Sequence, residues 1–187
     1  DILLSYRALK NNNELSCSKI AHLIDAVALC KFLFWYKNYS GKLTELDVVE
    51  KVNDLRMQNR KFICTAFPTI AGAGKNGAII HYQPNKKSNK NIFSNDILLL
   101  DSGGQYFYGT TDVTRTITRN AKISKTIIRD YTLVLKSHIN VNLSRFPIGT
   151  PGSFLDGVAR KNLWDIGKDF AHSTGHGVGH CLNVHEG

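Results

Sequence analysis

A run of three leucines ends directly at an aspartate, and two glycines follow almost at once: Leu98-Leu99-Leu100-Asp101-Ser102-Gly103-Gly104. A short apolar run that stops at a turn signal predicts a strand, which we expect over residues 96–101. A carboxylate at the end of such a strand is costly to bury unless something compensates its charge. The sequence therefore predicts a functional carboxylate at position 101.

A second carboxylate follows in the segment Thr111-Asp112-Val113-Thr114-Arg115. The glycine turn can fold the next strand back and bring Asp112 beside Asp101. Two carboxylates at that distance repel each other, and a divalent cation is the natural remedy. The alternative is structural: an exposed aspartate in a turn, and a strand aspartate paired with Arg115. The residues alone leave both interpretations open.

Four of the seven histidines lie close together near the end of the sequence. They are His172, His176, His180 and His185. Because glycines flank His176, a backbone can approach a metal or substrate closely there. Such a cluster favours a site, although a surface metal-chelating tract has the same composition. Carboxylates with one imidazole suit Mn²⁺, Co²⁺ or Zn²⁺, and two such ions can share and activate a water that hydrolyses an amide.

Hydrophobic spacing and turn signals predict an α+β fold with an antiparallel sheet covered on one face by helices. Thr44 and Asp47 resemble a capping box and start the second helix. The expected helices cover residues 14–37, 44–58, 125–143 and 153–166. The expected strands cover residues 62–67, 77–82, 96–101, 105–108 and 112–118, and a glycine-rich loop or distorted strand starts at residue 172.

Several function classes are disfavoured by composition and context. The net charge is +9, but the one basic run, residues 86–90, has no interleaved aromatics, so we expect no nucleic-acid partner. The longest apolar stretch, residues 21–36, is too short and too charged to span a membrane. The glycines of residues 72–77 match G-x-G-x-x-G but lead into an expected strand, which argues against a dinucleotide site.

The four cysteines are scattered and form no C-x-x-C pair. This spacing indicates neither a zinc knuckle nor a dense disulfide framework. We expect reduced, mostly buried thiols in a cytoplasmic protein.

At these residues the chain resembles the pita-bread metallopeptidase family, which includes creatinase-like proteins and aminopeptidases, and within it the cytosolic aminopeptidases P, or Xaa-Pro aminopeptidases. The matching segments are residues 24–30, 77–82, 100–106, 109–116 and 175–187. The resemblance implies that residues 1–187 form a single partial catalytic domain of the pita-bread fold, incomplete at its C-terminal end. It also implies two further glutamate ligands beyond residue 187 and additional N-terminal domains, so the fragment alone is expected to be inactive.

The same resemblance implies roles for individual residues. Asp101 corresponds to a terminal ligand of one metal ion, Asp112 to a bridging ligand, and His176 to a ligand of the second ion. The cofactors implied are two divalent ions, with Mn²⁺ preferred over Zn²⁺ or Co²⁺. His81, His172 and His185 correspond to catalytic histidines that position the substrate and assist proton transfer.

The implied reaction removes the N-terminal residue that precedes proline, through attack by a metal-bridged hydroxide. The implied partners are peptide substrates with proline in second position, and a second copy of the chain in a homodimer; neither nucleic acid nor a membrane is expected. The alternatives are a prolidase or methionine aminopeptidase of the same fold, or a non-catalytic module that binds peptides or histones. Retention of Asp101, Asp112 and His176 argues against the non-catalytic module.

Overall fold

The computed structural model describes residues 2–119 and 122–186. The chain divides into two compact units. The first comprises Asp1–Asn120 and His176–Gly187, and the second comprises Ala121–Gly175. Helices and antiparallel sheets are both present, so the predicted α+β class is confirmed.

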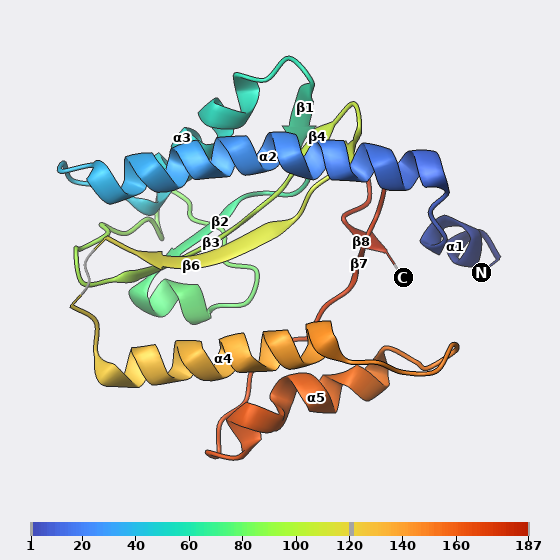
Figure 1. Ribbon diagram of the computed structural model, residues 1–187. Helices are drawn as coiled ribbons and strands as arrows, with labels where there is room; N and C mark the ends of the chain where they lie inside the picture. The colour runs from blue at the N-terminus through green and yellow to red at the C-terminus, as the bar shows by residue number, and fades with distance from the viewer. Residues whose placement is uncertain (1, 120–121, 187) are drawn as a thin grey trace. The chain divides into compact units, whose positions relative to one another are not determined.

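The first unit begins with three helices (Figure 1). They are α1 (Ile2–Ala8), α2 (Asn12–Asn38) and α3 (Glu45–Met57). The predicted capping box starts α3: the Asp47 N–H donates to Thr44 Oγ1 at 3.3 Å, and the Thr44 N–H donates to Asp47 Oδ2 at 2.7 Å. The helices predicted over residues 14–37 and 44–58 are therefore confirmed, with small shifts at their ends.

Three small antiparallel sheets follow the helices (Figure 1). The first has the strand order β1 (Phe62–Thr65), β4 (Gly104–Tyr106), β5 (Gly109–Thr110). The second has the order β2 (Ile70–Ala73), β3 (Ile97–Ser102), β6 (Val113–Thr118). The third pairs β7 (Gly177–Val178) with β8 (His185–Glu186).

The core lies between α2, α3 and the sheet of β2, β3 and β6. Phe32 and Val48 from the helices pack in one buried cluster with Leu98 and Leu100 from β3. Successive residues of a strand point to opposite faces, so the face that buries Leu98 and Leu100 turns Asp101 to the other side of the sheet. The leucine run thus lies in the predicted strand, which continues one residue further than predicted, to the buried Ser102.

The strand predicted over residues 77–82 is wrong. The short helix η1 (Gly74–Ala78) and a turn occupy this segment, and β2 comes directly before it. Gly74 has φ +54°, a conformation open to glycine that takes the chain out of the strand. The buried Glu45 carboxylate then accepts hydrogen bonds from Ala73 N–H at 2.8 Å and Asn76 Nδ2 at 2.9 Å, which fixes the new direction.

The prediction of mostly buried cysteines is also wrong. Cys30, Cys64 and Cys181 are exposed, and Cys17 is partly buried. All four are free cysteines in this structure. Cys30 lies on the exposed side of α2, which also carries the exposed apolar residues Leu23, Val27 and Phe34, whereas Ala28, Leu29 and Phe32 are buried.

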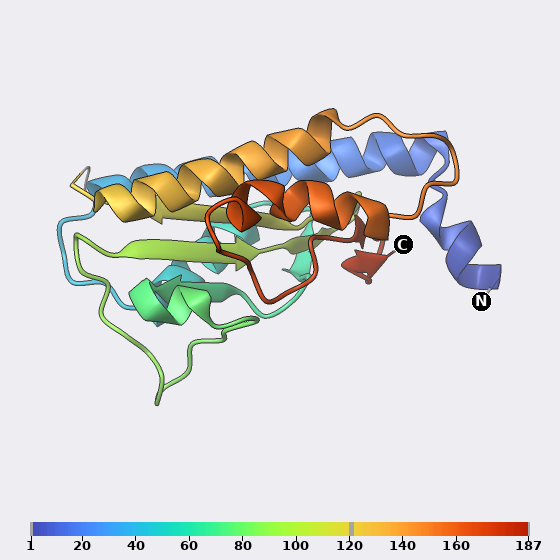
Figure 2. The ribbon, with the colours of Figure 1, turned by 90° about the horizontal axis from the view of Figure 1, so that it is seen from below.

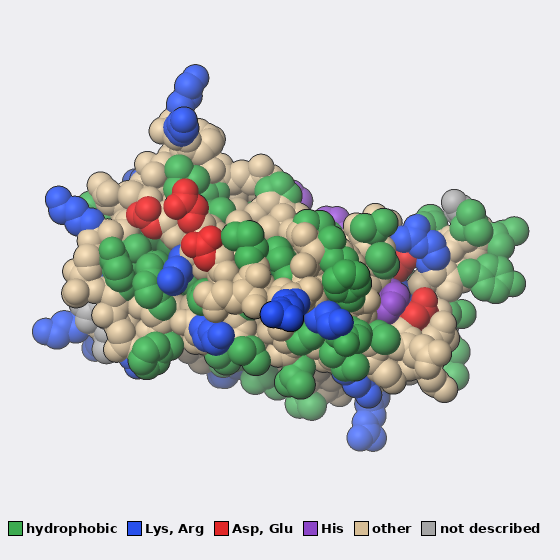
Figure 3. Space-filling view, turned by 90° about the horizontal axis from the view of Figure 1, so that it is seen from above, with side chains coloured by type: hydrophobic (Ala, Val, Ile, Leu, Met, Phe, Trp, Pro, Cys, Tyr) green, Lys and Arg blue, Asp and Glu red, His purple; other side chains and the backbone are tan. Residues whose placement is uncertain are grey.

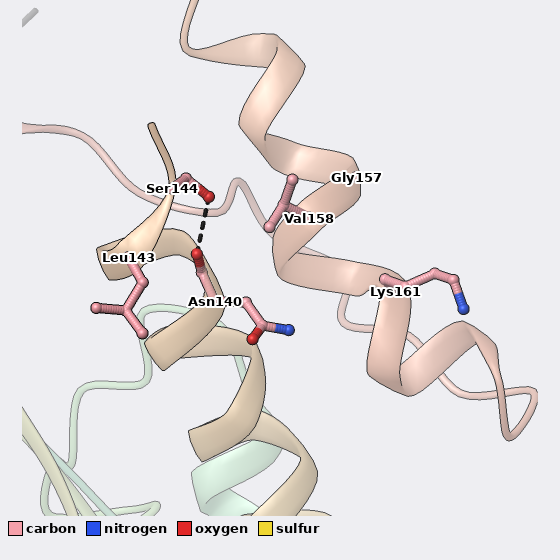
Figure 4. A pocket seen from close by; sticks show the side chains of 6 residues that line it. All are labelled: Asn140, Leu143, Ser144, Gly157, Val158 and Lys161. Carbon is pink, nitrogen blue, oxygen red and sulfur yellow. Dashed lines mark hydrogen bonds between the residues drawn. The ribbon is translucent and has the colours of Figure 1, made fainter. Parts of the chain in front are cut away.

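The second unit consists chiefly of two helices, α4 (Lys125–Leu143) and α5 (Ser153–Trp164), which pack along each other (Figures 1 and 2). Both were expected from the sequence, and α4 has the predicted bounds. A shallow cavity of about 540 Å³ lies between them (Figure 4). It is lined by Asn140, Leu143, Ser144, Gly157, Val158 and Lys161.

The surface charge and the helix composition can both be compared with what the sequence predicts. Lys and Arg side chains are scattered over the face drawn in Figure 3 and form no continuous patch there. Among the described residues, no helix combines the length and the apolar character needed to cross a bilayer.

Candidate metal centre

The two aspartates singled out in the sequence lie together at the end of β3. Asp101 is the penultimate residue of β3 and pairs with Thr114 of β6, and Asp112 directly precedes β6. Burial raises the pKa of Asp112, and the neighbouring charge of Asp101 raises it further. The antiparallel pairing of β3 with β6 produces the predicted juxtaposition of Asp101 and Asp112. The predicted turn at Gly103 and Gly104 is wrong, because β4 begins at Gly104 and the chain turns at Phe107 and Tyr108.

The alternative in which Asp101 is an exposed turn residue and Asp112 pairs with Arg115 does not agree with the structure. The Arg115 guanidinium donates from Nη1 to the Thr114 carbonyl at 2.7 Å, and it makes no ion pair with Asp112 among the described residues. Asp101 is not an exposed turn residue either, because it lies within β3 and is partly buried. Both carboxylates therefore need another source of compensation.

Asp101 has an oxygen with no partner. Its Oδ1 atom is buried and forms no hydrogen bond within the described part of the chain. A buried carboxylate oxygen without a donor is unfavourable. A cation held between Asp101 and Asp112 would satisfy this oxygen and remove the repulsion between the two carboxylates.

His176 completes the cluster from the C-terminal hairpin. Its Nε2 atom lies 3.3 Å from Asp112 Oδ2, and its Nδ1 atom lies 2.8 Å from the Gly177 carbonyl oxygen. The contact with Gly177 assigns the proton of a neutral imidazole to Nδ1, so the Nε2 lone pair faces Asp112. A histidine that donates its other ring N–H to a backbone carbonyl has the usual arrangement of a metal ligand.

The pairing of β7 with β8 brings His185 beside His176. Val178 pairs with His185 in this hairpin, and the rings of His176 and His185 lie 4.2 Å apart in an edge-to-face arrangement. His185 is thus positioned next to the Asp101–Asp112 pair through His176. Of the three catalytic histidines implied by the resemblance, it is the one that the structure places in this cluster.

His81 is not brought into contact with the two aspartates, and His172 lies in the other compact unit. His81 is exposed in the turn after η1, at φ +55°, and has no hydrogen bond or ion pair to Asp101 or Asp112 within the described residues. His172 belongs to the second unit, where its Nδ1 atom lies 2.7 Å from the Ser173 carbonyl oxygen. The roles of both histidines stay predictions.

Glu186 is engaged elsewhere. Lys10 Nζ lies 2.6 Å and Arg7 Nε 3.1 Å from its carboxylate oxygens, and the hydrogen bond from Lys10 lowers the pKa of Glu186. These two cations compensate the Glu186 charge, so its carboxylate is not a ligand of the cluster.

Sequence reasoning missed a second polar cluster, buried directly behind Asp101. Arg56 Nε donates to Asp25 Oδ1 at 2.7 Å, and Arg56 Nη2 donates to Asp25 Oδ2 and Ser102 Oγ, both at 3.1 Å. Tyr106 Oη donates to Asp25 Oδ1 at 2.6 Å. The signal was the charge at Asp25, which, together with Lys31, interrupts the apolar stretch of residues 21–36.

The residues present fit a divalent metal in type and orientation, but they form only part of a coordination sphere. Asp101 contributes an unpartnered oxygen, Asp112 a second carboxylate, and His176 a nitrogen lone pair. Within residues 2–119 and 122–186, no group of three or more His, Cys, Asp and Glu side chains is close enough to hold a metal ion by itself.

Comparisons with known proteins agree with this chemistry. The model of metallopeptidase family M24 matches residues 16–187. Aminopeptidase P2 of Arabidopsis thaliana is 46% identical over 97% of this chain and 26% of its own length. Xaa-Pro aminopeptidase 1 of Dictyostelium discoideum is 45% identical over 100% of this chain and 30% of its own length. The chain therefore spans less than a third of either relative.

Solved structures show the same fold. The X-prolyl aminopeptidase of Caenorhabditis elegans, described as a cytosolic enzyme with a di-nuclear active site, superposes with a TM-score of 0.95 at 41% identity. It is covered over 31% of its length by the whole of this chain. The prolidase of Pyrococcus horikoshii gives a TM-score of 0.86 at 29% identity, with the whole of this chain covering 51% of its length. These matches confirm the expected pita-bread fold.

Proposed function

The chain belongs to metallopeptidase family M24, and on this premise we propose that the protein is a two-metal aminopeptidase that removes the N-terminal residue preceding proline. The observation that carries the proposal is the cluster of Asp101, Asp112 and His176, in which a buried carboxylate oxygen lacks a donor and a histidine nitrogen faces a carboxylate. Relatives at 45–46% identity are named for aminopeptidase P or Xaa-Pro aminopeptidase activity.

In the proposed site, Asp101 would hold one ion, His176 would hold the other, and Asp112 would contribute to both. Hard carboxylate oxygens with one imidazole favour Mn²⁺, with Zn²⁺ and Co²⁺ as the alternatives. When bound, such a pair of ions lowers the pKa of a shared water and polarises the scissile carbonyl. Two further glutamate ligands, which the resemblance implies, remain part of the proposal.

The histidines are proposed to handle the substrate. His185 lies against His176, so its ring is within reach of a group bound beside that ligand. An imidazole there can donate to a substrate carbonyl or pass a proton to the leaving nitrogen. His81 and His172 are proposed to help position the peptide and transfer protons in the same way.

The prolidase and methionine aminopeptidase alternatives are less well supported. The curated relatives at 42–46% identity carry Xaa-Pro aminopeptidase or aminopeptidase P names, whereas the prolidase structure is 29% identical. A cytoplasmic location is part of the proposal and is supported by the unpaired cysteines and by the relative described as cytosolic. The homodimer remains an expectation from the resemblance.

Release of the first amino acid from an Xaa-Pro-Yaa tripeptide by the full-length protein tests this proposal. The assay compares the metal-free protein, the same protein with Mn²⁺, and the protein with a chelator. We expect Mn²⁺-dependent release that the chelator abolishes, and no release from an Xaa-Ala-Yaa control. Cleavage restricted to Xaa-Pro dipeptides would indicate a prolidase, and a folded protein that binds no metal would refute the proposal.

A further inference from the structure

The buried pair of Arg56 and Asp25 is the most unusual polar feature that the proposed reaction does not use. Both side chains are fully buried, and they belong to α3 and α2. A buried ion pair adds little net stability compared with well-packed apolar residues. Arg56 Nη1 is also buried without an acceptor among the described residues, so the pair is not arranged to maximise stability.

The Arg56–Asp25 pair is bonded to the end of β3 through Ser102. Ser102 follows Asp101 directly, is fully buried, and accepts a hydrogen bond from Arg56 Nη2 at 3.1 Å. The pairing of β2 with β3 stops at Ile70 and Asp101, so Ser102 is held by β6 on one side only. Arg56 supplies the missing restraint at the position where the strand carries its carboxylate.

The same pair holds the chain on the other side of Gly103. Tyr106 of β4 donates its hydroxyl to Asp25 Oδ1 at 2.6 Å. Asp25 therefore restrains β4 directly and β3 through Arg56. Gly103, the single residue between β3 and β4, therefore lies between two strands whose side chains are bonded, directly or through Arg56, to the Asp25 carboxylate.

The first residue of β4, Gly104, also fixes the segment that carries the second aspartate. Gly104 N–H donates to Thr111 Oγ1 at 2.9 Å, and Thr111 N–H donates to the Gly104 carbonyl at 2.9 Å. Thr111 directly precedes Asp112. A shift of β4 at Gly104 relative to the end of β3 would therefore move Asp101 and Asp112 relative to each other.

Asp101 depends on this restraint because its own carboxylate has little to orient it. Its Oδ1 atom has no hydrogen-bond donor within the described residues, so the backbone sets its position. We propose that the buried Arg56–Asp25 pair is a positioning device that sets the separation of Asp101 and Asp112 and thereby the affinity for metal. This inference rests on the proposed function, because it takes both aspartates as ligands.

The experiment compares three variants of the full-length protein. Ser102→Ala removes the hydrogen bond between Arg56 and the end of β3, and Tyr106→Phe removes the one between β4 and Asp25. Tyr82→Phe is the matched control, because the buried Tyr82 hydroxyl donates to the buried Glu45 carboxylate at 2.7 Å in a network that does not include Asp101 or Asp112. The measurements are the dissociation constant for Mn²⁺ by calorimetric titration and the melting temperature of the metal-free protein.

We expect Ser102→Ala and Tyr106→Phe to weaken Mn²⁺ binding about 10- to 100-fold, the range found for residues that orient metal ligands. Tyr82→Phe is expected to lower the melting temperature by a similar amount and to leave Mn²⁺ affinity unchanged. Equal Mn²⁺ affinity in the parent protein and in both test variants would overturn the positioning role. So would a loss of affinity in all three variants that follows the melting temperature. A parent protein that binds no Mn²⁺ would instead overturn the proposed function, and the inference with it.

Discussion

Replacement of Arg56 by methionine isolates the electrostatic cost of the buried pair. Arg56→Met keeps a long apolar side chain but leaves the Asp25 carboxylate buried, with the Tyr106 hydroxyl as its remaining donor. Loss of one member of a fully buried ion pair costs about 3–5 kcal/mol of folding free energy. We therefore expect Arg56→Met to lower the free energy of unfolding of the metal-free protein by that amount.

A second change tests whether uncompensated charge is the cause. Asp25→Asn, added to Arg56→Met, removes the charge and keeps a hydrogen-bonding group for Tyr106. The two residues are in direct contact, so we expect the second substitution to recover about 1–3 kcal/mol. Asp25→Asn alone should destabilise the protein, because it weakens the bonds from Arg56.

Urea denaturation at neutral pH measures these differences. The control is Lys161→Met, which breaks the ion pair between Lys161 of α5 and Asp165, the residue directly after that helix; both side chains are more than half exposed. An exposed pair with this spacing contributes about 0.3–0.5 kcal/mol. A cost for Arg56→Met no larger than the cost for Lys161→Met, or no recovery in the double variant, would refute this reasoning.

Three further predictions concern other parts of the chain. Asp112→Ala should remove metal binding and activity together. It should not destabilise the metal-free protein, because it deletes a desolvated carboxylate beside Asp101. Elemental analysis measures the bound metal and urea denaturation measures the stability, and retained metal would contradict the ligand assignment. Gly103→Ala should cost at least about 1–3 kcal/mol of unfolding free energy, because the added Cβ would lie 1.9 Å from the Thr111 carbonyl oxygen, and an unchanged denaturation midpoint would contradict that close approach. The pKa of Asp169 is lowered from 3.8 to about 2, chiefly by a hydrogen bond from the Trp164 indole. A lowered pKa contributes stability that is complete above the ordinary value and is lost as the pH falls through the lowered one. Asp169→Asn should therefore be less stable than the parent at neutral pH and match it near pH 2, at about the lowered pKa; a stability difference that does not change with pH would count against this.

The sequence predicted those parts of the fold that depend on local patterns. The capping residues Thr44 and Asp47 start α3 through bonds within one helical turn. The leucine run formed β3, and the close antiparallel return of β6 brought Asp112 to Asp101. These features require few contacts between distant segments.

The failures have causes that lie far away along the chain. The sequence of residues 77–82 has the short apolar pattern that is typical of a strand. The segment is held in another conformation because the Glu45 carboxylate of α3 accepts hydrogen bonds from the Ala73 N–H and from the Asn76 and Tyr82 side chains. Asp25 similarly looked like an interruption of an apolar helix, because its partner Arg56 belongs to another helix. Contact of His176 with Asp112 likewise depends on segments that only the folded chain brings together.

The three consecutive leucines leave β3 without a hydrophobic preference for one face. A slip of one residue would bury Leu99 in place of Leu98 or Leu100 with little change in apolar area, and it would turn Asp101 inward toward Asp25. The native alternation instead presents Ser102 to Arg56. The polar end of the strand therefore favours the observed register, because the slipped register would bring the Asp101 carboxylate against the carboxylate of Asp25.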